Sequence, residues 1–124
     1  MPDMVISGIL PWCLTPETYA ARPDYLQALA DFVRARPEQP VAAFERQADA
    51  VITHDAQAQL ARIRCRTLIT VGARDVITSE RFARRMHQAI AGSELQVYEG
   101  CAHAHFYERV EEFNQKTVAF LKQG

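Results

Sequence analysis

The stretch "RTLITVGARDVITSERFARRMHQAI", residues 66–90, decides the fold of this chain. Its first seven residues are rich in β-branched side chains and do not alternate strictly, which is typical of a strand covered on both faces. A helical pattern follows, because Phe82, Met86 and Ile90 recur at helical spacing, and Ser79 stands where it can cap that helix. The stretch therefore predicts a strand, a loop and a helix in succession.

A second strand and a second helix complete this half of the chain. In "SELQVYEG", residues 93–100, Leu95 and Val97 are expected to point the same way. "VEEFNQKTVAFL", residues 110–121, carries an apolar stripe of helical period. Strand–helix–strand–helix order implies parallel strands, so we expect an α/β fold here.

The first half of the chain is predicted to be helical. Apolar residues recur at helical spacing in segments 22–35, 40–52 and 53–63, with a shorter turn at 16–21. Asp55 can cap the third of these segments. Two parallel strands alone do not make a stable sheet, which needs more strands and helices on both faces. We therefore expect that partners complete the sheet or that the chain is a piece of something larger.

Composition and charge narrow the class of function. The chain has 124 residues, of which 48% are hydrophobic and 23% charged, as in an ordinary soluble domain. A net charge of −1 gives no field that favours nucleic acid or an acidic membrane surface, and no apolar run approaches a membrane span. The cysteines Cys13, Cys65 and Cys101 lack C-x-x-C spacing, and no signal-peptide pattern opens the sequence. These features favour a cytoplasmic chain.

Side chains capable of acid–base chemistry follow both predicted strands. In open parallel sheets, ligands bind beyond the carboxyl ends of the strands. The first such loop, "GARDVITS", carries Asp75, and the second, "GCAHAHFYE", carries His103 and His105. Because the two loops leave the same edge of the sheet, Asp75 can meet His103, and a carboxylate that orients an imidazole is the acid–base half of a Ser-His-Asp relay. We expect His105 to be structural.

The stretches "LARIRCRTLITVGARDVITSERFARRMHQAI" and "SELQVYEGCAHAHFYERVEEFNQKTVAFL" resemble the C-terminal end of an α/β-hydrolase. The resemblance implies that Asp75 is the triad acid and His103 the triad base, with Glu108 at the position of the family's glutamate. It further implies a helical cap-like segment in residues 1–63 and the last two parallel strands with their helices in residues 64–124. The nearest members cleave esters and lactones and need no metal or organic cofactor.

One part of the family's machinery is missing from the sequence. In the family, the nucleophilic serine lies in a Gly-x-Ser-x-Gly elbow ahead of the cap, and backbone amides near it form the oxyanion hole. The chain contains Ser7, Ser79 and Ser93, and none of them lies in such an elbow. The resemblance therefore implies hydrolysis of an ester or lactone in a complete enzyme, and we expect this chain to be inactive alone.

The sequence is compatible with three further hypotheses. A substrate pocket between cap and core is one, and its candidate lining residues are Trp12, Phe82 and Phe106. A zinc site is another, since thiolate and imidazole ligands suit zinc, but the spacing indicates no fourth ligand beside Cys101, His103 and His105. The third is a non-catalytic module that forms a homo-oligomer or docks on a partner through the exposed edge of its first strand.

Overall fold

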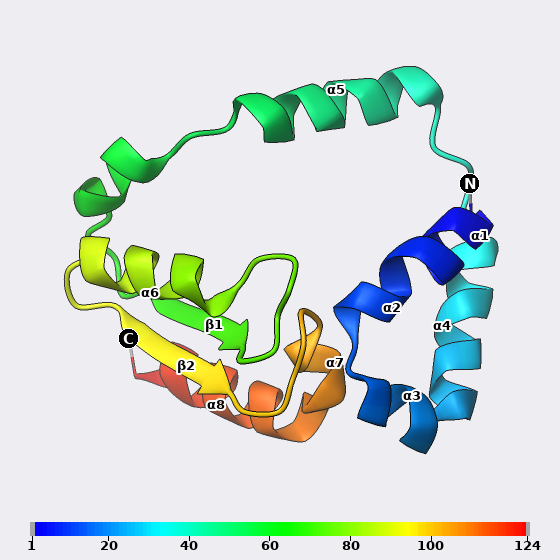
Figure 1. Ribbon diagram of the computed structural model, residues 1–124. Helices are drawn as coiled ribbons and strands as arrows, with labels where there is room; N and C mark the ends of the chain where they lie inside the picture. Colours follow the sequence, from blue (N-terminus) through cyan, green and yellow to red (C-terminus); the bar gives the residue numbers. More distant parts are fainter. Residues whose placement is uncertain (1, 124) are drawn as a thin grey trace.

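The computed structural model describes residues 2–123 and places helices on both sides of a two-stranded parallel sheet (Figure 1). Strand β1 (Leu68–Gly72) pairs with strand β2 (Glu94–Tyr98). Helix α6 (Glu80–Ala89) connects the strands on one side, and helix α8 (Val110–Lys122) follows on the other. The α/β order expected for the C-terminal half is therefore confirmed.

Alternation along the two strands separates the two faces of the sheet. Ile69 lies beside Leu95 and Val71 beside Val97 in the parallel register, so these four side chains share the face beneath α6. They pack there with Ala83, Ile90, Leu60 and Ile63. On the opposite face the ring of Tyr98 packs against Phe113 of α8, with 6.1 Å between the ring centroids. Each face thus has its own helix, as buried parallel strands require.

The N-terminal half is helical, as predicted. Its elements are α1 (Pro2–Met4), the π-helical turn η1 (Val5–Ile9), α2 (Leu10–Cys13), α3 (Pro16–Ala21), α4 (Pro23–Arg34), α5 (Val41–Thr53) and the 3-10 helix η2 (Gln57–Arg62). Asp55 lies two residues ahead of η2 and its carboxylate accepts the Gln57 N–H at 3.0 Å, but the N-cap position is occupied by Ala56. Four elements were not predicted: α1, η1 and α2 ahead of residue 14, and the short helix α7 (His105–Glu108).

Ser79 differs from its expected role. It occupies the N-cap position of α6, but its hydroxyl makes no capping hydrogen bond to the helix. The Phe82 N–H, which such a cap would bind, donates to the Ser79 carbonyl at 2.9 Å, and the neighbouring Thr78 N–H donates to Asp75. The loop is therefore organised around the Asp75 carboxylate rather than around a serine cap.

Helix α5 stretches between η2 and the N-terminal helices, apart from the sheet (Figure 1). None of its residues is buried, and Val51 and Ile52 are 76% and 79% exposed. Among residues 2–123, no helix is both long and apolar enough to cross a membrane. The apolar stripe of α5 is thus left uncovered within the described chain.

The absence of a side chain at Gly72 lets the loops after β1 and β2 touch. A Cβ on Gly72 would lie 2.5 Å from the Cys101 carbonyl oxygen and closer still to that of Ala102. The same approach lets the Arg74 N–H donate to the Cys101 carbonyl at 2.8 Å. Gly72 therefore sets the distance between the loop that carries Asp75 and the loop that carries His103.

Replacing Gly72 with alanine should lower the free energy of unfolding by about 1–3 kcal/mol, because the new methyl group meets rigid backbone. Urea unfolding followed by circular dichroism measures this. Gly8→Ala is the matched control. Gly8 lies in a helical segment, and a Cβ there would have its nearest neighbour at 4.0 Å. That control should leave stability equal or higher by up to about 1 kcal/mol. Equal stabilities of Gly72→Ala and the wild type would contradict the close approach.

Candidate active site

Asp75 is buried in the loop between β1 and α6. Its side chain is 3% exposed, and four donors surround its carboxylate. Oδ1 accepts the N–H groups of Ile77 and Thr78, each at 2.8 Å, and Oδ2 accepts the Thr78 hydroxyl at 2.9 Å. The fourth donor is the imidazole of His103. The loop thus closes on its own carboxylate in an Asx-type turn.

His103 and Asp75 form the pair that the sequence predicted. Nδ1 of His103 lies 2.9 Å from Asp75 Oδ2, and the Thr78 hydroxyl oxygen is 3.2 Å from the same nitrogen. Because an ionised carboxylate accepts hydrogen bonds, Nδ1 carries a proton and donates it. Within residues 2–123, no group hydrogen-bonds Nε2, and the side chain is 35% exposed. The free lone pair of the neutral imidazole is therefore on Nε2.

Asp75 remains ionised at this site. Burial by itself favours the protonated carboxyl, but the hydrogen bonds from Thr78, His103 and Ile77 outweigh it and hold the pKa of Asp75 below the ordinary aspartate value. An ionised acid beside Nδ1 favours the positively charged imidazolium if Nε2 takes up a proton. The arrangement can therefore accept a proton at Nε2 and stabilise the resulting charge.

Glu108 holds the loop that carries His103. Its Oε2 accepts the Ala102 N–H at 2.6 Å, and its Oε1 accepts donors from Thr15 and Thr18 in the N-terminal half. Burial alone raises the pKa of Glu108, but these hydrogen bonds reverse the effect and hold it below the ordinary glutamate value. A second ionised carboxylate thus binds the backbone of the histidine loop.

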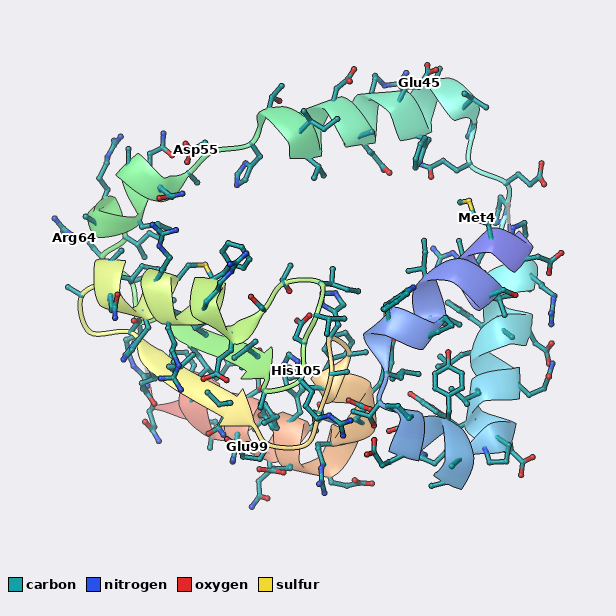
Figure 2. The ribbon with its side chains drawn as sticks, in the orientation of Figure 1. Met4, Glu45, Asp55, Arg64, Glu99 and His105 are labelled. Carbon is teal, nitrogen blue, oxygen red and sulfur yellow. The ribbon has the colours of Figure 1, made fainter. Side chains whose placement is uncertain are left out.

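His105 is a buried structural residue, as expected. Its Nδ1 lies 3.2 Å from the His103 carbonyl and its Nε2 3.0 Å from the Thr70 hydroxyl, while its ring stacks on Tyr98 at 5.0 Å between centroids. Figure 2 shows the labelled His105 in the interior, near the end of β1. Burial lowers the pKa of His105, because it disfavours the charged imidazolium. Both ring nitrogens are therefore occupied by protein groups.

The side chains proposed for zinc point to separate partners. The Cys101 thiol is directed to the Glu99 carbonyl, His103 to Asp75, and His105 to Thr70. In the part of the chain that the structure describes, no three His, Cys, Asp or Glu side chains are gathered closely enough to hold a metal ion. The three side chains therefore do not converge on a common metal site.

Two of the three candidate pocket residues lie beside the pair. Phe82 and Phe106 line a hollow of about 210 Å³ together with Asp75 and His103. Trp12 lines a different hollow of about 440 Å³, which borders Asp75 from the N-terminal side and does not include His103. The structure therefore places Phe82 and Phe106 with His103, and Trp12 apart from it.

Sequence reasoning missed the threonines of the site. Thr78 follows Asp75 by three residues, a spacing typical of a local side-chain turn, so the sequence held a signal for it. Thr15 and Thr18 lie 93 and 90 residues from Glu108, and no local pattern could have connected them. Only the folded chain brings these hydroxyls to the carboxylate.

Asp75→Asn should destabilise the chain at neutral pH by about 2 kcal/mol, because hydrogen bonds to a charged acceptor are lost. The sign of the pH dependence follows from the lowered pKa of Asp75. The stability that the carboxylate adds is present above the unfolded pKa of about 3.9 and is lost as the pH falls through the lower folded pKa. The difference between wild type and variant should therefore shrink below about pH 3.9.

Urea unfolding of both proteins at pH 7 and at successive acidic pH values measures this difference. Asp55→Asn is the matched control, since Asp55 is exposed and its carboxylate accepts only the Gln57 N–H among the described residues. A gap between wild type and Asp75→Asn that stays constant with pH would contradict an ionised, hydrogen-bonded Asp75.

Comparison with known proteins bears on the fold of the chain. No family model matches the chain. It is 30% identical over 104 residues to a 2-hydroxy-6-oxononadienedioate/2-hydroxy-6-oxononatrienedioate hydrolase of Escherichia coli O81, a match that covers 84% of this chain and 32% of the relative. The enol-lactonase of Burkholderia xenovorans LB400 superposes with a TM-score of 0.84 at 22% identity, over 97% of this chain and 45% of that chain.

Two further solved structures share the fold. A thermophilic esterase of Thermogutta terrifontis gives a TM-score of 0.84 at 21% identity, over 98% of this chain and 44% of the esterase. An α/β hydrolase enzyme from a Medee basin deep-sea metagenome gives 0.79 at 21% identity, over 99% of this chain and 46% of that chain. The chain thus spans less than half the length of each of these four proteins. It is related to the α/β-hydrolase superfamily and has part of the α/β-hydrolase fold.

Proposed function

We propose that this chain supplies the acid–base part of a serine hydrolase that cleaves ester or lactone bonds. His103 is the general base and Asp75 the acid that orients it. The observation that carries the proposal is the 2.9 Å bond from His103 Nδ1 to a buried, ionised carboxylate, with Nε2 left free beside a hollow. The enol-lactonase and the esterase that share the fold support the choice of bond.

The proposed reaction moves one proton through Nε2. A serine hydroxyl attacks the carbonyl carbon of the substrate while Nε2 takes the hydroxyl proton, and Asp75 stabilises the imidazolium. As the tetrahedral intermediate collapses, the imidazolium gives the proton to the departing alkoxide, which leaves an acyl-enzyme. Water then attacks the acyl group with Nε2 again as base, and the serine is regenerated. These steps use only protein side chains and water.

The nucleophile in this proposal comes from a segment outside the described residues. Among the hydroxyls of residues 2–123, that of Thr78 faces Nδ1 rather than Nε2, and that of Ser93 pairs with His87 at 2.9 Å. The chain covers less than half of the enol-lactonase and esterase. The remainder of a longer protein, or a partner chain, would bring both the serine and the oxyanion hole to Nε2.

The surroundings of Nε2 suit an apolar group next to the scissile bond. Phe82 and Phe106 are 43% and 39% exposed, and both line the hollow that His103 opens into. Large exposed aromatic side chains beside a polar pair are typical of a ligand site. The names of the relatives give different substrates. We therefore propose the class of bond and a small-molecule substrate, without naming the substrate. The cytoplasmic location stays a prediction.

The proposal is tested by placing an α/β-hydrolase segment with a Gly-x-Ser-x-Gly elbow ahead of this chain and assaying a p-nitrophenyl ester. The fused protein should turn the ester over, whereas the chain alone should show no turnover above that of free imidazole. His103→Ala and Asp75→Asn should each lower kcat of the fused protein by about 10⁴-fold, the loss typical of a disabled triad.

His54→Ala is the matched control, because His54 is exposed in the turn ahead of η2 and is not part of the proposed machinery. It should leave kcat unchanged. Turnover by the fused protein that survives His103→Ala would show that His103 is not the base. Turnover by the chain alone that depends on His103 would instead contradict the need for an external nucleophile.

The second candidate function is association with a partner, and the exposed apolar stripe of α5 favours it. Phe44, Val51 and Ile52 are each between 47% and 79% exposed, and a cluster of this kind on a free helix is costly in water. We expect the isolated chain to form a homo-oligomer through this surface. Analytical ultracentrifugation should give a mass above 14.0 kDa, and Val51→Glu should restore the single chain. A wild-type mass of 14.0 kDa would count against association.

A further inference from the structure

The Glu108 carboxylate joins two parts of the chain, one through each of its oxygens. Oε1 receives the Thr15 N–H at 2.7 Å, the Thr15 hydroxyl at 2.7 Å and the Thr18 hydroxyl at 2.6 Å, all from the start of α3. Oε2 receives the Ala102 N–H at 2.6 Å. The carboxylate is therefore shared between the helical N-terminal half and the residue that directly precedes His103.

This bridge lies where the two halves of the chain meet. The Ala104 N–H donates to the Cys13 carbonyl at 2.7 Å, so both neighbours of His103 are fixed from outside their own loop. Arg74 adds an exposed ion pair to Glu17 at 2.9 Å. The Glu108 carboxylate and the Ala104–Cys13 bond therefore both join the N-terminal half to the histidine loop, and of the two only Glu108 does so through a side chain.

The bridge is buried at Thr15 and at Ala102. Thr15 and Ala102 are 4% and 5% exposed, so water does not compete for the hydrogen bonds at either end. Hydrogen bonds to a charged acceptor are stronger than those between neutral groups, and four donors reach this carboxylate, three at Oε1 and one at Oε2. A change at Thr15 or Thr18 is therefore transmitted to Ala102 through a single carboxylate, that of Glu108.

We propose that Glu108 is a positioning residue that couples the start of α3 to His103 through the Ala102 N–H. Displacing the α3 end of the bridge changes the alignment of His103 with Asp75. This change in alignment alters how readily Nε2 of His103 accepts a proton. This inference rests on the proposed function of His103, and it adds a connection through which the N-terminal helical segment adjusts that function.

The test uses the chain itself, labelled with ¹⁵N, and three variants. Thr18→Val keeps the side-chain shape but removes one donor at the α3 end, leaving the bond from Ala102 to Oε2 in place. Glu108→Gln keeps the size of the side chain but removes the negative charge that both ends of the bridge bind. Glu112→Gln is the matched control, a carboxylate on the following helix that pairs with Lys116 at 2.7 Å.

Two signals are read by NMR: the exchange rate of the Ala102 amide, and the downfield resonance of the His103 Nδ1 proton held by Asp75. Glu108→Gln should speed Ala102 exchange at least about tenfold, because a hydrogen bond to a charged acceptor is lost. It should also broaden or remove the Nδ1 resonance. Thr18→Val should move both signals in the same direction by a smaller amount, and Glu112→Gln should move neither.

Each outcome decides the inference. Wild-type signals in Thr18→Val would overturn it, even if Glu108→Gln fails to fold, because coupling must then be absent. A folded but less stable Glu108→Gln with an unchanged Nδ1 resonance would assign Glu108 a purely structural role and also overturn it. A wild-type chain without the Nδ1 resonance would contradict the proposed function of His103, and a response of the Ala102 amide to Thr18→Val would then show the coupling separately.

Discussion

The hydrogen bond between His103 and Asp75 exists because two backbone loops approach each other more closely than side chains would allow. Gly72 ends β1 against the carbonyls of Cys101 and Ala102, and the Arg74 N–H crosses to the Cys101 carbonyl. Parallel pairing of β1 and β2 brings the two loops to one edge, but pairing alone does not fix their separation. The missing side chain at Gly72 therefore sets the distance across which the carboxylate and the imidazole bond.

Two ionised carboxylates organise the site in complementary ways. Asp75 is held mainly by its own turn and faces the His103 ring, whereas Glu108 is held by distant threonines and faces the backbone that carries the ring. Both are ionised because hydrogen bonds outweigh the cost of burial. The imidazole is thereby fixed from two directions, through Nδ1 and through the backbone before it.

The C-terminal half could be predicted from sequence, because its signals are local. β-Branched runs, helical stripes and the loops that follow the strands gave the order of elements, and the motif in each loop pointed to Asp75 and His103. The cap role of Ser79 was wrong, since the Phe82 N–H that its hydroxyl would bind donates to the Ser79 carbonyl. Contacts between distant residues, such as Thr15 with Glu108, depend on packing that no periodicity encodes. The placement of Trp12 away from His103 has the same cause.

The turn that encloses Asp75 has a consequence for how the pair works. Its carboxylate is aligned by the amides of Ile77 and Thr78, which are two and three residues away, so the alignment is completed when a few residues fold. No rotamer of Asp75 has to be ordered when a ligand arrives, and no water has to leave its carboxylate, since the side chain is already buried. The dipoles around the histidine are thus preorganised, so the proposed proton transfer would need little reorganisation energy.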